Sequence, residues 1–246
     1  MAEKVALITG GARRVGAAVC RSLHTAGLDL MVHYRSSADD ARALQAELNA
    51  VRPESVALVQ ADLLNISSLP TMVNDTVRQF GRLDVLINNA SSYYPTPVGE
   101  VGEGEWEDLM GTNLKTPLFL SQAAAPHLKR NHGCIVNIVD IHADRPMRNY
   151  LVYSVAKGGL LALTRALASE LGPEVRVNGV SPGVILWPED ERWSDEVARQ
   201  RIIHTTLLKR VGEPEDIART VRFLVLDAPY VTGQIIAVDG GRSISL

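Results

Sequence analysis

Three residues of this sequence could together carry out acid catalysis: Asp140, Tyr153 and Lys157. Tyr153 and Lys157 lie four positions apart in a segment with an apolar helical pattern, so they share one face of a helix. An ammonium stabilises a neighbouring phenolate, and we expect Lys157 to lower the pKa of Tyr153 and improve it as a proton donor. Asp140 follows a short apolar stretch, at the kind of strand end where open sheets bind ligands. Taken alone, the tyrosine and lysine are more simply explained as packed and solvated side chains, so the rest of the chain must decide.

A glycine-rich turn precedes the first helical pattern of the chain, from Gly10 to Gly16. Glycines at such a turn let the backbone approach a pyrophosphate, which then lies on the amino end of the helix. Arg14 stands where most turns of this type have a middle glycine, and its guanidinium would project beside the phosphates. The turn therefore predicts dinucleotide binding, with contacts from Gly10, Arg13, Arg14, Val15 and Gly16.

The end of the second predicted strand indicates which dinucleotide binds. An NAD enzyme usually has an acidic residue here for the ribose 2′-hydroxyl, and this chain has none. An arginine with two hydroxyls suits a 2′-phosphate instead, and Arg13 could join them. Two aspartates lie close by and weaken this charge argument. NADPH is the predicted cofactor, and the predicted contacts are Tyr34, Arg35, Ser36 and Ser37.

Polar residues after the next two strands are predicted to complete the cofactor site. Asp62 is placed to bond an adenine amino group, and Asn88 and Ala90 to contact the cofactor ribose. Asn113 lies among apolar neighbours in a long helical segment, where a buried polar side chain needs partners. It either holds a water next to Lys157 or caps a kink beside a nearby proline. No metal site is expected.

Strand-like and helical segments alternate along the chain and position these residues. The strands are apolar on both faces, which predicts a parallel sheet of about seven strands with helices on both faces. With a glycine turn after the first strand, residues 1–246 are expected to form one α/β domain, a Rossmann-like doubly wound fold. Loops 91–104 and 184–206 are long for this architecture and are predicted to be irregular substrate loops. The segment 106–129 is expected to be one helix bent by its prolines.

Composition narrows the class of protein. The 246 residues are 46% hydrophobic, enough for the core of one domain, and the net charge of −3 points to neither nucleic acid nor a membrane as partner. The amino-terminal sequence has no features of a leader, and no run approaches the ~20 apolar residues of a membrane span. Cys20 and Cys134 are expected to be reduced and buried, and the protein to be cytoplasmic.

Over essentially its whole length the sequence resembles the short-chain dehydrogenase/reductase family. The matching motifs are TGGARRVG at 9–16, ADL at 61–63, NNA at 88–90, Asn113, YSVAK at 153–157, SPG at 181–183 and DGG at 239–241. The resemblance implies that Tyr153 donates a proton, that Lys157 binds the nicotinamide ribose, and that Asn113 is a further catalytic residue. Other contacts that it implies for the cofactor are Leu63, Ser91, Ser181 and Gly183.

Two departures from the common family pattern are similar to its pteridine reductase branch. Arg14 replaces a glycine of the turn, and Asp140 replaces the usual catalytic serine. The likeness to that branch implies that Arg14 reaches toward both the phosphates and the substrate. It also implies that Tyr93 sandwiches a pterin ring against the nicotinamide and that Ser91 bonds the edge of the pterin.

The resemblance also sets expectations for the assembly and the second long loop. Members of the family are commonly homotetramers, so the helical segments 106–129 and 151–171 are expected at the main interface. The tail 242–246 is expected to reach a neighbouring subunit. Trp187 and Trp193, on the loop, either cover the substrate or pack against the protein.

Substrate chemistry favours the same branch. A ketone reductase needs a neutral donor beside a carbonyl oxygen, and serine serves. A pterin is reduced at a C=N bond, so a ring nitrogen gains a proton, which a carboxyl group bonded to Tyr153 can relay from water. The predicted function is NADPH-dependent reduction of dihydrobiopterin, dihydromonapterin or dihydrofolate, and oxidised pterins or folates are further candidates. The alternatives are a reductase of a ketone or 3-oxoacyl thioester and, from another class, a non-catalytic NADPH-sensing protein.

Overall fold

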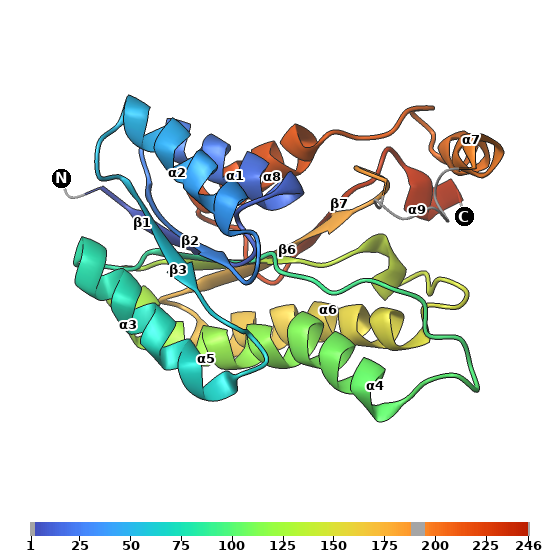
Figure 1. Cartoon of the computed structure of the whole chain (residues 1–246), viewed down its shortest axis with the longest axis horizontal. Coiled ribbons are helices and arrows are strands. Elements are labelled where there is room, and N and C mark those ends of the chain that lie inside the picture. Colours follow the sequence, from blue (N-terminus) through green and yellow to red (C-terminus); the bar gives the residue numbers. More distant parts are fainter. Residues whose placement is uncertain (1–2, 188–194, 246) are drawn as a thin grey trace.

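A single sheet of seven parallel strands organises the molecule (Figure 1). The computed structural model describes residues 3–187 and 195–245. The strand order is β3-β2-β1-β4-β5-β6-β7, so the connections run outward in both directions from β1. The strands are β1 Val5–Ile8, β2 Asp29–Tyr34, β3 Val56–Gln60, β4 Val85–Asn88, β5 Cys134–Ile138, β6 Arg176–Pro182 and β7 Ile235–Val238. This confirms the predicted doubly wound α/β fold.

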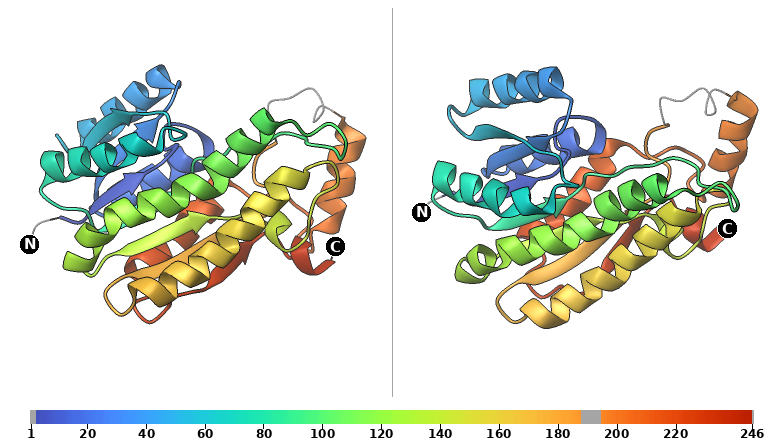
Figure 2. Two further views of the ribbon diagram at one scale, coloured as in Figure 1. Left: turned by 90° about the horizontal axis from the view of Figure 1, so that it is seen from below. Right: turned by 60° about the horizontal axis from the view of Figure 1, so that its bottom comes forward.

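Helices cover both faces of the sheet (Figures 1 and 2). One layer contains α1, α2 and α8, and the other contains α3, α5 and α6, with α4 beside α6. Their bounds are α1 Arg14–Thr25, α2 Ala38–Val51, α3 Leu69–Phe80, α4 Glu103–Met110, α5 Thr116–Arg130, α6 Leu151–Leu171 and α8 Pro214–Leu226. Leu23 and Val221 belong to the buried cluster under the first layer, and Leu86 and Leu120 to the cluster under the second. The sheet therefore separates two cores.

Burial on both faces explains why the strands are almost wholly apolar. Every residue of β1, β4 and β5 is buried. Because successive side chains of a strand point to opposite faces, such strands need a helix layer on each side. The connections follow ordinary helix signals: Pro70 lies in the first turn of α3, and Gly81 ends that helix with a φ of 79°. These signals bring the carboxyl ends of all seven strands to one edge.

The segment 106–129 is helical throughout, as predicted, but it is not one regular α-helix. Helix α4 runs directly into a π-helical segment at Gly111–Lys115 and then into α5. Pro117 lies in the first turn of α5, directly after the π-helical segment, and Pro126 stays inside that helix. Asn113 lies in the middle of the π-helical segment, and π-helical segments are frequent at functional sites.

The stretch 184–206, predicted as irregular, contains helix α7 Glu196–Thr205. The carboxylate of Asp195 caps this helix by accepting a hydrogen bond from the amide of Val197 at 2.9 Å. The helix has no buried residue, so its sequence lacks the apolar stripe that would have predicted it. Trp193, expected either to cover the substrate or to pack against the protein, falls outside the described residues.

Helix α6 is the long apolar helix that carries Tyr153 and Lys157. By length and composition alone it could cross a membrane, contrary to the expectation that no segment would. Its most apolar window is 56% buried inside the protein, and Leu160 packs in a cluster with Val139 at the end of β5. These contacts identify α6 as a core helix of the domain.

Candidate active site

A cavity of about 750 Å³ opens at the carboxyl ends of the strands. Open α/β sheets bind ligands at this edge, beside the strand where the order reverses. Its walls come from the glycine turn, from segments that follow the strands, and from α6, α7 and the carboxyl-terminal tail. The predicted site residues that line it are Gly10, Arg13, Arg14, Val15, Gly16, Arg35, Ser36, Ser37, Asp62, Leu63, Ala90, Ser91, Tyr93, Asp140, Tyr153, Lys157, Gly183 and Trp187.

Asp140 and Tyr153 form a hydrogen-bonded pair in the wall of the cavity. The hydroxyl of Tyr153 donates to Oδ2 of Asp140 at 2.8 Å. The other carboxylate oxygen, Oδ1, accepts from the backbone amide of His142 at 2.8 Å, which fixes the orientation of the carboxylate. Because Asp140 follows β5 and Tyr153 lies in the first turn of α6, the sheet and the helix together set this distance. A carboxyl group and a phenol joined in this way can pass a proton between them.

Lys157 shares the cavity-facing side of α6 with Tyr153. Its ammonium donates to the carbonyl of Ile138 at 2.9 Å and lies 5.7 Å from the centre of the Tyr153 ring. Burial lowers the pKa of Lys157 to about 8, and the charge of Asp140 opposes that change. Burial, followed by the charge of Asp140, raises the pKa of Tyr153 well above its usual value. Burial and the nearby carboxylate thus act against the lowering of the Tyr153 pKa that we expected from Lys157.

The glycine turn has the backbone that dinucleotide binding requires. Gly10 has a φ of 60°, and Arg14 has a φ of 53°, which is uncommon for a residue with a Cβ. Arg14 therefore keeps the left-handed backbone of the glycine that it replaces. A Cβ at Gly16 would lie 2.2 Å from the carbonyl oxygen of Gly10, so no side chain fits there. The amino end of α1 faces the cavity, where its amides can bind phosphate oxygens.

His33 holds this turn in place, although the sequence did not identify it as a site residue. The backbone amide of Gly10 donates to Nδ1 of His33 at 3.1 Å. The proton must then lie on Nε2, which donates to the carbonyl of Ala61 at 3.1 Å. The contact with Gly10 requires a neutral imidazole, and burial lowers the pKa of His33. The ring thus joins the glycine turn to the ends of β2 and β3.

The residues predicted to bind a 2′-phosphate line the cavity at the end of β2: Arg35, Ser36 and Ser37. The two aspartates that follow them in the sequence do not line the cavity. Asp39 pairs with Arg42 at 3.0 Å, and Asp40 lies 3.8 Å from Arg13. Asp39 is thus engaged by an arginine outside the cavity, whereas Asp40 lies beside Arg13, one of the predicted phosphate contacts, and its charge still opposes an anion there.

The side chain of Arg14 also holds the second long loop. Its Nη2 donates to the carbonyls of Trp187 at 3.1 Å and Leu186 at 3.4 Å. The guanidinium of Arg199, on α7, lies 5.4 Å from the centre of the Trp187 ring, which is a cation–π contact. Arg14 therefore connects the glycine turn to the loop that covers the cavity.

The ring of Tyr93 forms an aromatic wall beside the catalytic pair. It stacks on Tyr150 with ring centres 4.7 Å apart and meets Tyr153 edge to face at 4.9 Å. Its hydroxyl donates to the sulfur of Met147 at 3.6 Å, and burial raises the pKa of that hydroxyl. These contacts fix the plane of the ring, while its stacking on a pterin stays a prediction.

Asn113 acts on the site through Ser91 rather than by lining the cavity. The hydroxyl of Ser91 donates to Oδ1 of Asn113 at 2.7 Å. The side-chain amide of Asn113 donates to the carbonyls of Ser92 and Leu109, both at 2.9 Å. The carbonyl of Leu109 is the one that the backbone amide of Asn113 would use in a regular α-helix. The side chain competes for it, and this explains why the helix widens here.

Alternation along β4 corrects the prediction for Asn88. Its side chain points into the interior, where its amide donates to Oδ1 of Asn137 at 2.8 Å. The next residue, Asn89, lines the cavity instead, and its amide donates to the carbonyl of Gly10 at 3.0 Å. Successive side chains of a strand point to opposite faces, so only one of the pair can face the cofactor site. Three further predicted site residues that do not line the cavity are Tyr34, Asn113 and Ser181.

Comparisons with known proteins cover nearly the whole chain. Residues 10–243 match a family described as enoyl-(acyl carrier protein) reductase. The chain is 38% identical to pteridine reductase 1 of Leishmania tarentolae, over 98% of this chain and 96% of that protein. It is 36% identical to a 3-oxoacyl-[acyl-carrier-protein] reductase of Staphylococcus epidermidis, over 97% and 98% of the two chains. It is also 36% identical to granaticin polyketide synthase putative ketoacyl reductase 2 of Streptomyces violaceoruber, over 98% and 96%. These identities are too close to one another to select a substrate.

Proposed function

Because the chain belongs to the short-chain dehydrogenase/reductase family, we propose that it reduces pterins with NADPH. Family membership makes it an NAD(P)-dependent reductase of a small molecule. The finer proposal is that dihydrobiopterin, dihydromonapterin or dihydrofolate is reduced to the tetrahydro form, with oxidised pterin or folate as further substrates. The observation that carries it is the 2.8 Å hydrogen bond between Tyr153 and Asp140.

A carboxyl group at this position suits reduction of a C=N bond. When the carbon of that bond accepts a hydride, the nitrogen accepts a proton, and the site must supply it. The phenol of Tyr153 gives its proton to the nitrogen, and the carboxyl group of Asp140 returns a proton from water to the phenolate oxygen. The ammonium of Lys157, near the Tyr153 ring, stabilises the negative oxygen between these two transfers.

The cavity residues fit a nicotinamide dinucleotide, which supplies the hydride when it is bound. The glycine turn and the amino end of α1, both of which line the cavity, would hold a pyrophosphate. Arg35 lines the cavity and takes part in no ion pair within the part of the chain that the structure describes. Its charge is therefore available for a 2′-phosphate, which supports NADPH rather than NADH.

A second candidate is reduction of a 3-oxoacyl thioester. The near-equal identity to a 3-oxoacyl-[acyl-carrier-protein] reductase favours it. The presence of Asp140 argues against this second candidate, because reduction of a ketone needs only a neutral donor beside the carbonyl oxygen. A catalytically inactive NADPH-binding protein is a weaker alternative, since the Tyr153–Asp140 pair is already assembled.

A substrate panel tests the proposal. NADPH oxidation by the wild-type protein is measured with dihydrobiopterin, dihydrofolate and an acetoacetyl thioester in parallel. We expect kcat/KM to be at least about tenfold higher for dihydrobiopterin than for the thioester, a difference of about 1.4 kcal/mol in transition-state binding. A preference for the thioester would support the second candidate, and NADPH binding without turnover of any substrate would support the third.

We also propose that the protein is a homotetramer. Large apolar side chains are exposed on α4, α5 and α6: Trp106, Leu118, Leu151 and Val155. A set of exposed apolar residues on neighbouring helices is a common sign of a protein interface. Light scattering on the purified protein should give the mass of a tetramer, and a monomer mass would contradict this proposal.

A further inference from the structure

Arg242 brings the carboxyl-terminal tail into the catalytic end of the cavity. It is the first residue of the short helix α9 Arg242–Ser245, and its side chain lines the cavity. Its Nε is fully buried and has no hydrogen-bond partner among residues 3–187 and 195–245. The guanidinium as a whole takes part in no hydrogen bond or ion pair with the described residues, so its other donors remain for an acceptor on a bound molecule.

The surroundings of Arg242 separate it from the phosphate end of the cavity. The charges of Asp140 and Tyr93 act on its guanidinium and oppose the burial that lowers its pKa. Three other arginines that line the cavity belong instead to the glycine turn and to the end of β2: Arg13, Arg14 and Arg35. A guanidinium stays charged at any working pH and presents a planar fork of donors. Arg242 therefore places a cationic donor in the same cavity as Asp140 and Tyr93, within electrostatic reach of both.

Contacts on both sides hold the tail in this position. The carboxylate of Asp239 accepts the backbone amides of Gly241 at 2.9 Å and Ser243 at 2.7 Å. The hydroxyl of Ser245 donates to the carbonyl of Thr205, the last residue of α7. The tail thus packs on its own chain, while its contact with a neighbouring subunit stays a prediction. Arg242 has a defined position, as a binding residue must.

We propose that Arg242 anchors the substrate by donating hydrogen bonds to a substrate oxygen next to the atom that Tyr153 protonates. This inference rests on the proposed function. In a dihydropterin two kinds of oxygen meet the description: the ring carbonyl near the protonated nitrogen, and the hydroxyls of the side chain on the neighbouring carbon. Both accept hydrogen bonds from a guanidinium. Arg242 then decides how the reacting bond is placed against Tyr153, and it determines which substrates bind.

Kinetics of R242Q and R242K test this anchor. With dihydrobiopterin, R242Q should raise KM by about 10- to 100-fold, the range for losing a charged hydrogen bond. R242K keeps the charge but not the fork and should give a smaller increase. The Kd for NADPH, measured by fluorescence, should stay within about twofold in both variants, because Arg242 belongs to α9 and to neither the glycine turn nor the end of β2. A 6-methyl dihydropterin, which lacks the hydroxyls, identifies the oxygen: an equal loss assigns the ring carbonyl, and a smaller loss assigns the side chain.

Control variants distinguish a role of Arg242 in substrate binding from a merely structural effect of its replacement. R201Q removes an exposed guanidinium from α7, which also contributes to the cavity wall, and should leave KM unchanged. D239N loosens the tail and should raise KM in the same direction as R242Q. An unchanged KM in R242Q overturns the proposal, and so does a parallel rise in KM for substrate and Kd for NADPH. If the wild type reduces only the acetoacetyl thioester, the proposed function fails, and the same comparison on that substrate still decides whether Arg242 anchors its second carbonyl oxygen.

Discussion

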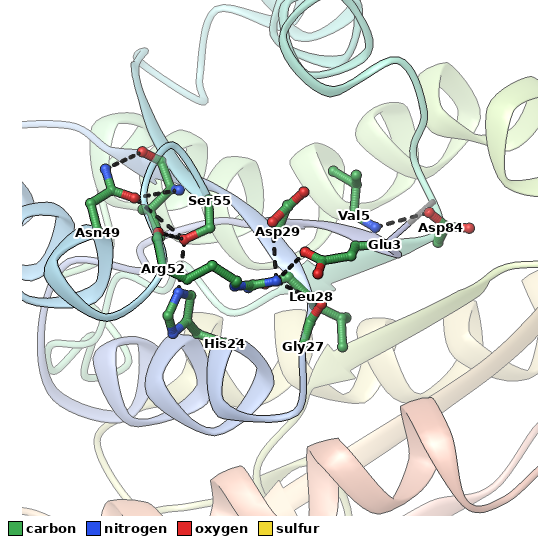
Figure 3. Close-up of polar contacts among 11 residues, drawn as sticks. Glu3, Val5, His24, Gly27, Leu28, Asp29, Asn49, Arg52, Ser55 and Asp84 are labelled. Carbon is green, nitrogen blue, oxygen red and sulfur yellow. Dashed lines mark hydrogen bonds and ion pairs between the residues drawn. The ribbon is translucent and has the colours of Figure 1, made fainter. Parts of the chain in front are cut away.

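The two ends of the sheet use polar residues in opposite ways. At the amino ends of the strands, polar side chains bond to one another and to the backbone in closed networks (Figure 3). Arg52 donates to the carbonyls of Gly27, at 2.9 Å, and Leu28, and it pairs with Glu3 and with Asp29 at 3.3 Å. Four acceptors thus surround one guanidinium, and this network holds β2 against its neighbours.

Asp84 makes a second closed network at the same end. Its carboxylate accepts the backbone amide of Val5 at 2.9 Å, which ties β1 to the start of β4 (Figure 3). It also accepts both Nε and Nη2 of Arg82, at 2.8 and 2.6 Å. His24 and Ser55 form a further buried contact at 2.8 Å.

At the carboxyl ends, by contrast, polar groups are directed into a cavity. Asp140 and Tyr153 bond to each other but still line the cavity, and the buried Nε of Arg242 has no partner in the described part of the chain. A fold that satisfies its polar groups gains stability, whereas groups left open can be satisfied by a ligand. Changes at the two ends should therefore have separate effects, on stability at one and on activity at the other.

The largest effect is expected from Tyr153→Phe. It removes the proton donor and should lower kcat by about 100- to 10,000-fold, the usual contribution of a general acid. The free energy of unfolding should change by no more than about 1 kcal/mol, because only one hydroxyl is lost. Steady-state kinetics and urea denaturation measure the two quantities.

Tyr94→Phe is the matched control for that change. The hydroxyl of Tyr94 donates to the carboxylate of Asp108 at 3.0 Å, and Tyr94 does not line the cavity. We expect its kcat to stay within about twofold of the wild type, since general-acid effects require contact with the reacting group. If Tyr94→Phe lowered kcat as much as Tyr153→Phe does, the proposed distinction between structural and catalytic hydroxyls would be wrong.

The next effect should appear at the amino end, in Asp84→Ala. The change leaves the amide of Val5 and the guanidinium of Arg82 without their shared acceptor, and should cost about 2–4 kcal/mol of unfolding free energy. The kcat of the folded protein should stay within about twofold. Asp75→Ala, which breaks an exposed pair with Arg78, is the control and should cost about 0.5 kcal/mol or less. If Asp84→Ala lost activity without losing stability, the polar network at the amino ends of the strands would not serve stability alone.

A smaller effect is expected on cofactor choice from Arg35→Ser. Losing one charged contact to a 2′-phosphate should raise the KM for NADPH by about 10- to 100-fold and leave the KM for NADH nearly unchanged. Arg42→Ser removes a guanidinium that pairs with Asp39 outside the cavity, and it should alter neither value. Equal effects of the two changes would show that Arg35 has no specific role.

The smallest effects concern two buried histidines, one at each end of the sheet. Burial lowers the pKa of both His24 and His33 from the usual 6.5, so the folded protein holds them neutral. Their contribution to stability is complete above pH 6.5 and is lost as the pH falls through 6.5 toward the lowered values, because the unfolded chain takes up the protons first. His24→Gln and His33→Gln should each flatten the dependence of unfolding free energy on pH.

The two histidines should differ in their effect on the cofactor. His33 accepts the amide of Gly10, so acid should weaken NADPH binding through His33 but not through His24. Fluorescence titration of NADPH between pH 5 and 7 would show this difference. If the acid sensitivity of NADPH binding is the same in His33→Gln as in the wild type, the hydrogen bond between Gly10 and His33 has no role in NADPH binding.

Local signals in the sequence were enough to predict the sheet and most of the cavity wall. Buried strands, the glycine turn and helix ends such as Gly81 depend on neighbours in the chain, and so does the spacing of Tyr153 and Lys157. The direction of Asn88 was predictable in principle, because strand alternation allows only Asn88 or Asn89 to face the cavity.

Other features depend on contacts between distant segments. The π-helical segment after α4 contains Asn113, whose side-chain amide donates hydrogen bonds to the carbonyls of Ser92 and Leu109. No helical sequence pattern predicts these contacts. The raised pKa of Tyr153 follows from burial and from Asp140, so it required the packed structure. Arg242 reaches the site only because the tail folds back over α7. Residues that reach the site through tertiary packing have no sequence motif by which they could be identified.

We propose that the Asp140–Tyr153 pair makes this protein a pterin reductase, and the variant Asp140→Ser is the sharpest test of that role. Serine is the donor that suits a carbonyl oxygen, so it should keep ketone chemistry possible while removing the proton relay. Measured with dihydrobiopterin, kcat/KM of Asp140→Ser should fall by about 100-fold or more, while the Kd for NADPH stays within about twofold. A variant that reduces dihydrobiopterin as well as the wild type would contradict the account.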